Sequence, residues 1–254
     1  MKKWLVLVLC CVATIVNGED HMKNIPTREG VTISFYYMKR DGATASVILL
    51  PGGVGGIGVK EGIPTSSNFL VRSRDFFAEN GFNVAVVGIP SDRDGLTETF
   101  RVSPEHMEDL RHVALFLKKQ SGVPVWIVGT SMGTISATAA AINLKGNYLQ
   151  GIVLTSSVTS QKRTGAVPWQ ELDKVTIPTL VVHHEFDGCK ICVPSEVSEI
   201  VRRLKNAPVK KELYVSGGDG AKGNPCEALH YHGYIGMEKD VIDLISSWIK
   251  KPTP

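Results

Sequence analysis

A serine flanked by two glycines is the feature of this 254-residue chain that most clearly suggests chemistry. Residues 129–133 read Gly-Thr-Ser-Met-Gly, between an apolar run and an alanine-rich stretch. A serine on a sharp turn from a buried strand into a helix holds its hydroxyl above the sheet, where it can act as a nucleophile. The first amides of that helix point at the same place, so the Met132 N–H is expected to stabilise an oxyanion. We therefore predict Ser131 as the nucleophile; an ordinary tight turn is the alternative.

Short apolar runs recur along the chain and alternate with stretches of helical patterning. Uninterrupted runs of Val, Ile and Leu are typical of strands buried on both faces of a parallel sheet. The expected parallel strands cover residues 47–50, 84–87, 125–128, 152–154, 180–182 and 213–215. The expected helices cover residues 68–80, 104–120, 133–144, 195–204 and 238–250. Residues 31–38 alternate better and are expected to add an antiparallel edge strand. The pattern predicts one α/β domain with a mostly parallel, doubly wound sheet, whose ligands bind beyond the carboxyl ends of the strands.

The segment around Ser131, in this setting of strands and helices, resembles the α/β-hydrolase superfamily, and the resemblance covers nearly all of the chain after residue 18. That family orders its catalytic residues as serine, then aspartate or glutamate, then histidine. The resemblance implies a serine hydrolase that cleaves a small-molecule carboxylic ester through an acyl-enzyme intermediate and needs no cofactor or metal. A non-catalytic binding protein with the same fold is the alternative, and a missing member of the triad would be its sign.

The family's acid is expected shortly after the run at 180–182, and Asp187 stands there. An acid in this role accepts a hydrogen bond from the catalytic histidine and stabilises the imidazolium. Glu185 is the rival acid, because the direction of a side chain cannot be read from spacing alone. His183 and His184 precede the acid and are expected to pack or to bond loops.

The predicted base is His232, in a His-Gly-Tyr triplet that matches the family's His-Gly-Phe near the C-terminus. Its role would be to remove the proton from the Ser131 hydroxyl and to return it to the leaving group. His230 lies two residues earlier and is the rival base.

A glycine-rich segment, residues 51–58, follows the first expected parallel strand and is called the glycine loop below. In the family, the loop at this place donates the second oxyanion N–H, here from Gly53 or Val54. The same residues satisfy the dinucleotide-binding pattern Gly-x-Gly-x-x-Gly, which would place the protein in another functional class. That pattern must open a helix, but Gly62 and Pro64 interrupt one, and no acid for a ribose ends the next strand.

The site is expected to have an open mouth. Many relatives insert a lid after the strand at 152–154, whereas residues 156–176 leave room for one short helix around 169–174. Met132, Val54, Ile57 and Trp169 are expected to give the mouth an apolar lining. Short, water-soluble esters are the predicted substrates.

The first 18 residues are predicted to be a signal peptide, because two lysines precede an apolar run that is short for a bilayer span. A retained anchor or a buried first helix is the alternative. Its removal would leave residues 19–254 as one exported, periplasmic or extracellular domain without a stable membrane anchor. The formal net charge of +3 would fall to +1, so the composition favours no nucleic-acid partner. No sequence feature fixes an oligomeric state.

Three cysteines remain after residue 18, which in an oxidising compartment indicates one disulfide and one free thiol. The resemblance implies a bridge between Cys189 and Cys226. These two would approach if the acid and histidine loops run side by side. Pairings of Cys192 with either partner remain open. A zinc site formed by Cys189, Cys192, His183 and His184 is a further alternative, although one Cys-x-x-Cys pair alone is a weak signal.

Overall fold

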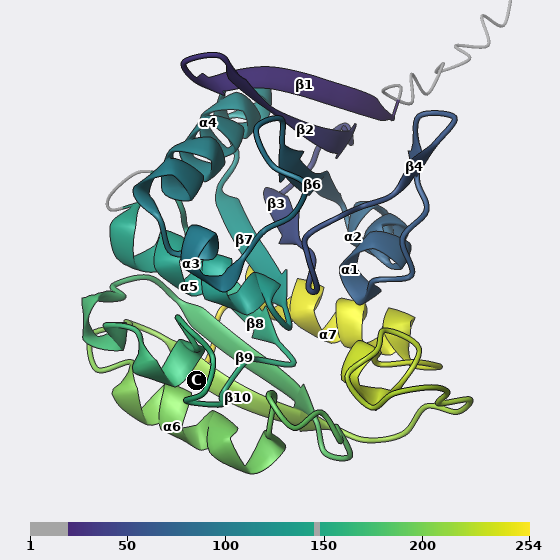
Figure 1. Cartoon of the computed structure of the whole chain (residues 1–254), viewed down its shortest axis with the longest axis vertical. Helices are drawn as coiled ribbons and strands as arrows, with labels where there is room; N and C mark the ends of the chain where they lie inside the picture. The colour runs from purple at the N-terminus through teal and green to yellow at the C-terminus, as the bar shows by residue number, and fades with distance from the viewer. Residues whose placement is uncertain (1–19, 145–147) are drawn as a thin grey trace, which may run out of the picture.

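An eight-stranded sheet forms the centre of the molecule (Figure 1). The computed structural model describes residues 20–144 and 148–254, so the predicted signal peptide lies outside the described residues. The strand order across the sheet is β1-β2-β6-β3-β7-β8-β9-β10. The bounds are β1 His21–Arg28, β2 Val31–Met38, β3 Ala45–Leu50, β6 Phe82–Pro90, β7 Val125–Thr130, β8 Gly151–Thr155, β9 Thr179–His184 and β10 Lys210–Val215. The β1–β2 and β2–β6 pairs are antiparallel, and the other neighbours are parallel.

All six expected parallel strands are present, each longer than the apolar run that predicted it. The strand at 31–38 also has its expected bounds, but it is not at the edge of the sheet, because β1 pairs along its outer side. Strand β1 was not predicted, because its polar residues and Pro26 interrupt the alternation of apolar residues. A proline lacks an N–H and is tolerated on an edge strand, and the β1–β2 register shifts beside Pro26.

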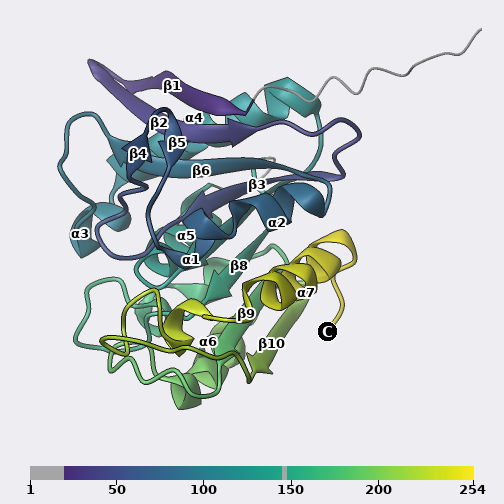
Figure 2. The ribbon, with the colours of Figure 1, turned by 90° about the vertical axis from the view of Figure 1, so that its right-hand side faces the viewer.

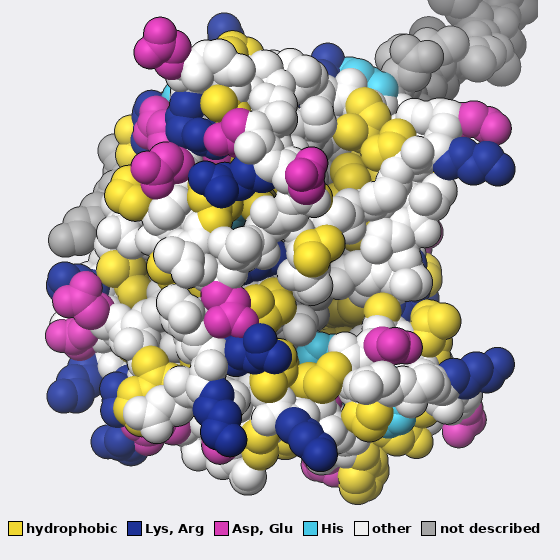
Figure 3. Space-filling view, viewed as in Figure 1, with side chains coloured by type: hydrophobic (Ala, Val, Ile, Leu, Met, Phe, Trp, Pro, Cys, Tyr) yellow, Lys and Arg dark blue, Asp and Glu magenta, His cyan; other side chains and the backbone are white. Residues whose placement is uncertain are grey.

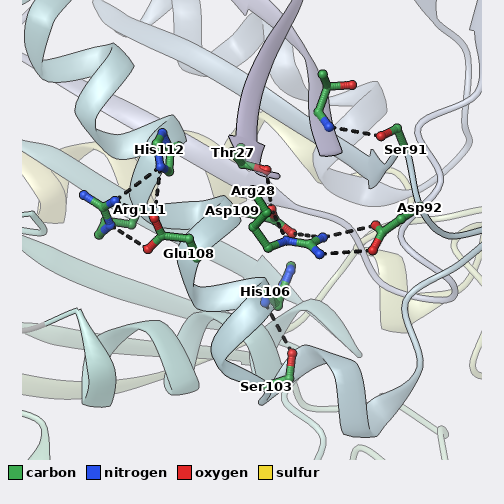
Figure 4. Close-up of polar contacts among 11 residues, drawn as sticks. Thr27, Arg28, Ser91, Asp92, Ser103, His106, Glu108, Asp109, Arg111 and His112 are labelled. Atoms are coloured by element: carbon green, nitrogen blue, oxygen red, sulfur yellow. Dashed lines mark hydrogen bonds and ion pairs between the residues drawn. The ribbon is translucent and has the colours of Figure 1, made fainter. Parts of the chain in front are cut away.

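Strand β1 is anchored to helix α4, Pro104–Ser121, by an ion-pair network (Figure 4). The Arg28 guanidinium donates to the buried Asp109 carboxylate and to Asp92, at 2.9 and 3.0 Å. The Thr27 hydroxyl also donates to Asp109. The edge strand is therefore held by side chains as well as by its ladder to β2.

Helices cover both faces of the sheet (Figures 1 and 2). The helices α4, α5 Gly133–Asn143 and α6 Val197–Arg203 pack on one face, around a core that includes Leu110, Ala137 and Ile200. The opposite face carries α1 Phe69–Arg72, α2 Arg74–Glu79 and α7 Glu238–Lys250, around Phe77 and Ile245. This is the doubly wound arrangement that the sequence predicted.

Two expected helices differ from the prediction in detail. The one at 68–80 is divided into α1 and α2 at the buried Ser73, and the one at 195–204 begins with the 3-10 turn η3, Pro194–Glu196. The glycine loop leads into a two-stranded hairpin of β4 Val59–Lys60 and β5 Ile63–Pro64. A dinucleotide-binding fingerprint must open a helix, and this loop does not. Among the described helices, none has the length and apolar character needed to cross a membrane.

Candidate active site

Ser131 occupies a strained turn between β7 and α5. Its φ of 52° is in the left-handed region, which a residue with a Cβ rarely adopts. The Ser131 N–H donates to the Thr155 carbonyl of β8 at 3.0 Å, and its carbonyl accepts from the Thr134 hydroxyl at 2.6 Å. These bonds from both sides hold the serine in a conformation that its own backbone disfavours.

The glycines on each side of this turn are required by close backbone contacts. A Cβ on Gly129 would lie 2.5 Å from the Gly133 carbonyl oxygen, and a Cβ on Gly133 would lie 2.0 Å from the Leu50 carbonyl oxygen. Both distances are far below van der Waals contact, so any larger residue would displace backbone. The pattern Gly-x-Ser-x-Gly is therefore explained by packing of β3, β7 and α5.

Asp187 follows β9 and is bonded to two histidines. Its Oδ2 lies 2.8 Å from His232 Nδ1 and 3.1 Å from His183 Nε2, and its Oδ1 accepts from the Cys189 N–H at 2.9 Å. The rival acid, Glu185, is exposed to solvent. The structure thus brings together His232 and the acid that the sequence preferred.

The Asp187 carboxyl is buried and yet ionised. Burial by itself would raise its pKa, but the hydrogen bonds from His183 and His232 outweigh burial and hold the pKa at about 2. A carboxylate kept ionised in this way can orient an imidazole and stabilise its protonated form. Spacing along the sequence did not show that His183, itself buried, would be a second donor to this carboxylate.

His232 lies in the 3-10 turn η4, Tyr231–Gly233, and is buried. Its carbonyl accepts from the Ser156 hydroxyl at 2.8 Å. Next to this turn, the Tyr234 hydroxyl donates to the Val182 carbonyl and accepts from the Ser156 N–H. Within the described part of the chain, His232 Nε2 has no hydrogen-bond partner. The ring is thus fixed through Nδ1 and its backbone, with the second nitrogen unengaged.

A cavity of about 320 Å³ contains both Ser131 and His232 in its lining. One wall comes from Gly52, Gly53, Val54 and Gly56 of the glycine loop, and another comes from the loop before His232, at Glu227 and Ala228. A third wall, at residues 66–69, was missed by the sequence analysis. The sequence marked one residue of this wall, because the expected helix at 68–80 begins at Asn68. In the structure, the Asn68 side chain caps α1 by accepting a hydrogen bond from the Leu70 N–H. In the space-filling view, mostly hydrophobic and uncharged groups surround the hollow in the middle of the face (Figure 3).

The glycine loop passes directly beside Ser131. A Cβ on Gly52 would lie 2.8 Å from Ser131 Cβ and 3.4 Å from Ser131 Oγ. Gly53 and Val54 line the cavity, and Val54 is 66% exposed. Met132 is the N-cap residue of α5, at the end of the helix where geometry leaves the N–H groups without intrahelical partners. Ser131 therefore lies between the glycine loop and the N-terminal end of α5.

Two residues that were expected to line the mouth of the site, Ile57 and Trp169, do not line the cavity that contains Ser131. Ile57 is 5% exposed and packs in the core, with Cδ1 near Gly88, so it does not line the cavity. Trp169 lies in η1, Val167–Trp169, with the Arg203 guanidinium 5.1 Å from its ring centre, and it also lies outside the lining. The Met132 side chain lines a neighbouring hollow with Gly53 and Val54. Side-chain direction in irregular segments depends on tertiary packing, which spacing does not encode.

Residues 156–178, all of which are described, form no lid, as their short length predicted. This segment contains the two short 3-10 turns η1 and η2, Leu172–Lys174, and η1 follows the buried Ala166. The expected single helix near Trp169 is therefore two short turns. Neither turn contributes a residue to the lining of the cavity.

The disulfide joins Cys189 to Cys226, as expected, with a Cα–Cα distance of 4.4 Å. It ties the loop after Asp187 to the loop before His232. Cys192 is the free, buried thiol. The sulfur atoms of Cys189 and Cys192 and a ring nitrogen of His232 lie within 4.8 Å of one another. Cys189 is bridged and His183 bonds Asp187, so two of the four donors of the alternative zinc site are already engaged.

Comparison with known proteins identifies the fold. No family model and no curated sequence matches the chain. Among solved structures, an esterase from Pyrococcus furiosus is similar at 16% identity and a TM-score of 0.66, over 92% of this chain and 91% of that one. A serine hydrolase without a lid from Xanthomonas campestris is similar at 15% identity and a TM-score of 0.61, over 93% and 98%. A dienelactone hydrolase from Anabaena variabilis is similar at 14% identity and a TM-score of 0.62, over 91% and 96%. These likenesses show that the chain has the α/β-hydrolase fold.

Proposed function

We propose that this α/β-hydrolase-fold chain is a serine hydrolase that cleaves carboxylic esters, with Ser131 as nucleophile, His232 as base and Asp187 as orienting acid. The observation that carries the proposal is the state of His232. Its Nδ1 is bonded to an ionised, buried carboxylate, while its Nε2 has no partner among the described residues and its ring lines the cavity that contains Ser131. An imidazole held in this way is prepared to accept a proton at Nε2.

The mechanism follows from these groups. His232 Nε2 removes the hydroxyl proton as Ser131 Oγ attacks the ester carbonyl carbon, and the carbonyl oxygen becomes an oxyanion. The Met132 N–H and an N–H of Gly53 or Val54 would stabilise that oxyanion. The imidazolium then donates its proton to the departing alcohol oxygen, which leaves an acyl-enzyme. Water, activated by the same nitrogen, attacks the acyl carbon and releases the carboxylic acid and the serine hydroxyl.

The cavity supports small substrates. A volume of about 320 Å³ is near the lower end of the range for small-molecule pockets. The segment after β8 does not cover it, so a dissolved ester has direct access to Ser131. We propose short-acyl, water-soluble esters as substrates, hydrolysed without activation at an interface. The predicted signal peptide and the Cys189–Cys226 bridge support export of the chain to an oxidising compartment.

The test is covalent labelling of the purified chain, residues 19–254, with a fluorophosphonate, followed by hydrolysis of p-nitrophenyl esters of increasing acyl length. We expect one label per chain on Ser131, no label on Ser131→Ala, and the highest kcat/KM for the shortest acyl groups. A folded wild-type protein that neither takes the label nor hydrolyses any ester would refute the proposal and favour a binding protein with a hydrolase fold. A rate that rises sharply only above the solubility limit of the ester would refute access without an interface.

A further inference from the structure

Arg101 is a buried cation without a carboxylate partner. It ends the short helix α3, Glu98–Arg101, and its exposed fraction is 0%. In the described part of the chain no aspartate or glutamate forms an ion pair with it, and its Nε has no hydrogen-bond partner. Burying an unpaired charge is costly, so such a residue usually serves a purpose other than stability.

The contacts of Arg101 are with the glycine loop and with α5. Its Nη2 donates to the Gly53 carbonyl at 3.0 Å and approaches the Pro51 carbonyl at 3.4 Å, while its Nη1 donates to the Ser136 hydroxyl at 3.1 Å. The Ser136 hydroxyl also lies 3.0 Å from His106 Nε2. The guanidinium therefore bridges the loop beside Ser131 and the helix that follows it.

Burial affects the protonation of Arg101 and of the neighbouring His106 in different ways. Burial lowers the pKa of Arg101 to about 10, so the guanidinium remains protonated at neutral pH. Burial, together with the nearby Arg101, Arg28 and Arg93 charges, lowers the pKa of His106 to about 3, so that imidazole is neutral. The loop carbonyls thus receive hydrogen bonds from a permanent cation, which are stronger than bonds from a neutral donor.

These bonds determine the direction of the loop amides. In a trans peptide the C=O and the following N–H point in opposite directions. With the Gly53 carbonyl held toward Arg101, the Val54 N–H of the same peptide is directed away from the guanidinium. The Pro51 carbonyl is approached from the same side, so the peptide that carries the Gly53 N–H lies between two restrained peptides. Gly53 has a φ of 56°, and the Gly55 N–H donates to the Gly52 carbonyl at 3.1 Å, so this is a tight turn with little freedom once both carbonyls are restrained.

We propose that Arg101 is a positioning residue that holds the glycine loop so that its N–H donors face the oxyanion formed at Ser131. The inference rests on the proposed function. Arg101 lies outside the lining of the cavity that contains Ser131 and acts through the Pro51 and Gly53 carbonyls. Its effect should therefore fall on the transition state, where the oxyanion exists, and leave the binding of the uncharged ester nearly unchanged.

The experiment compares Arg101→Met and Arg101→Lys with the control Arg74→Met. Arg74, the first residue of α2, is a suitable control because its side chain is also largely buried. It also donates to a backbone carbonyl, that of Val71 in α1, at 2.8 Å. Each variant is first compared with wild type by circular dichroism and urea unfolding. Then kcat and KM are measured for a short p-nitrophenyl ester and for the matching thionoester. Sulfur is a larger and weaker acceptor, so the preference for the oxoester reports on the donors around the oxyanion.

For Arg101→Met we expect kcat to fall about 10- to 100-fold, less than the 10²- to 10³-fold loss typical of deleting an oxyanion donor. KM should change less than about threefold, and the preference for the oxoester should fall by a similar factor to kcat. Arg101→Lys retains a charge and one donor and should recover part of both effects. Arg74→Met should retain the wild-type kcat and preference. If Arg101→Met does not fold, Arg101→Lys carries the same measurement.

A folded variant at Arg101 with wild-type kcat and wild-type preference for the oxoester would overturn the inference. So would a loss of kcat with an unchanged preference, because that result marks a merely structural role. These outcomes differ from failure of the proposed function itself, in which the wild-type protein would show neither ester hydrolysis nor labelling at Ser131.

Discussion

The two sides of the candidate site are held together by different kinds of interaction. On the nucleophile side, Ser131 lies where β3, β7 and α5 meet, and the backbones approach so closely that Gly129 and Gly133 admit no Cβ. On the other side, Asp187 and His232 lie on loops after β9 and β10, and their positions depend on side-chain bonds and the Cys189–Cys226 bridge.

The histidine side needs such bonds because its loop is long. Residues 216–230 contain no helix or strand and are mostly exposed. Beyond the disulfide, Arg72 donates to the Gly233 carbonyl and pairs with Glu238 at 2.9 Å, and the Tyr234 hydroxyl reaches Val182 on β9. A residue in a packed sheet is positioned by the core itself, whereas a residue on a long loop must be positioned by cross-links. The nucleophile side should therefore be sensitive to added volume, and the histidine side to lost bonds.

The largest expected effect comes from removing one reacting group on each side. Ser131→Ala and His232→Ala should each lower kcat/KM by about 10⁴- to 10⁶-fold, and the double variant should lose little more, because the members of the proposed triad would act as a unit. Ester hydrolysis under identical conditions measures all three. His230→Ala, two residues away, is the control and should keep near wild-type activity. Independent, multiplicative losses at Ser131 and His232 would show that the two sides do not act together.

Added volume on the nucleophile side should have the next largest effect. Gly133→Ala places a methyl group against the Leu50 carbonyl oxygen and should lower the free energy of unfolding by more than about 4 kcal/mol, or prevent folding. Gly42→Ala is the matched control: Gly42 has a φ of 67° with nothing within 4 Å of a Cβ, so only backbone strain of about 1–2 kcal/mol is expected. Urea unfolding distinguishes the two. Equal losses would show that close backbone approach is not what requires Gly133.

Removing the disulfide should weaken the histidine side. The bridge spans 37 residues of sequence, so Cys226→Ser should lower the free energy of unfolding by about 3–4 kcal/mol in the chain-entropy model. The variant is measured with reductant, so that the freed Cys189 cannot pair with Cys192. Its kcat should fall severalfold while it is still folded, because the loops around Asp187 and His232 lose their tie. Reductant should destabilise wild type to a similar extent; a wild type indifferent to it would contradict the expected role of the bridge.

The smallest expected effect is a pH dependence of stability from Asp187. Its folded pKa of about 2 is below the ordinary value of about 3.9, so ionised Asp187 stabilises the fold above about pH 4. This contribution, about 2–3 kcal/mol, is lost as the pH falls from 4 toward 2. Urea unfolding between pH 5 and pH 2.5 should show a steeper loss for wild type than for Asp187→Asn. The exposed Asp41→Asn serves as control, and equal slopes for wild type and Asp187→Asn would contradict this bonding of the carboxylate.

On the histidine side, the resemblance to a family predicted some of the contacts and missed one. Asp187, His232 and the Cys189–Cys226 pairing were expected from short motifs that match a family, and the structure brings these residues together. The second donor to Asp187, His183, was expected only to pack or to bond loops. Its role depends on the turn that follows the end of β9 at His184, because that turn brings Asp187 back beside His183.

The sequence by itself determined the parallel strands, the turn at Ser131 and the order of the candidate catalytic residues. Apolar runs and flanking glycines express requirements that are met within a few neighbouring residues. Only the tertiary structure decided that β1 lies at the edge, that residues 66–69 form a wall of the cavity, and that Arg101 reaches the glycine loop. It also decided that Ile57 enters the core and that Trp169 lies elsewhere. Each of these depends on contacts between segments distant in sequence, whose approach is set by the packing of the whole sheet and not by any local pattern.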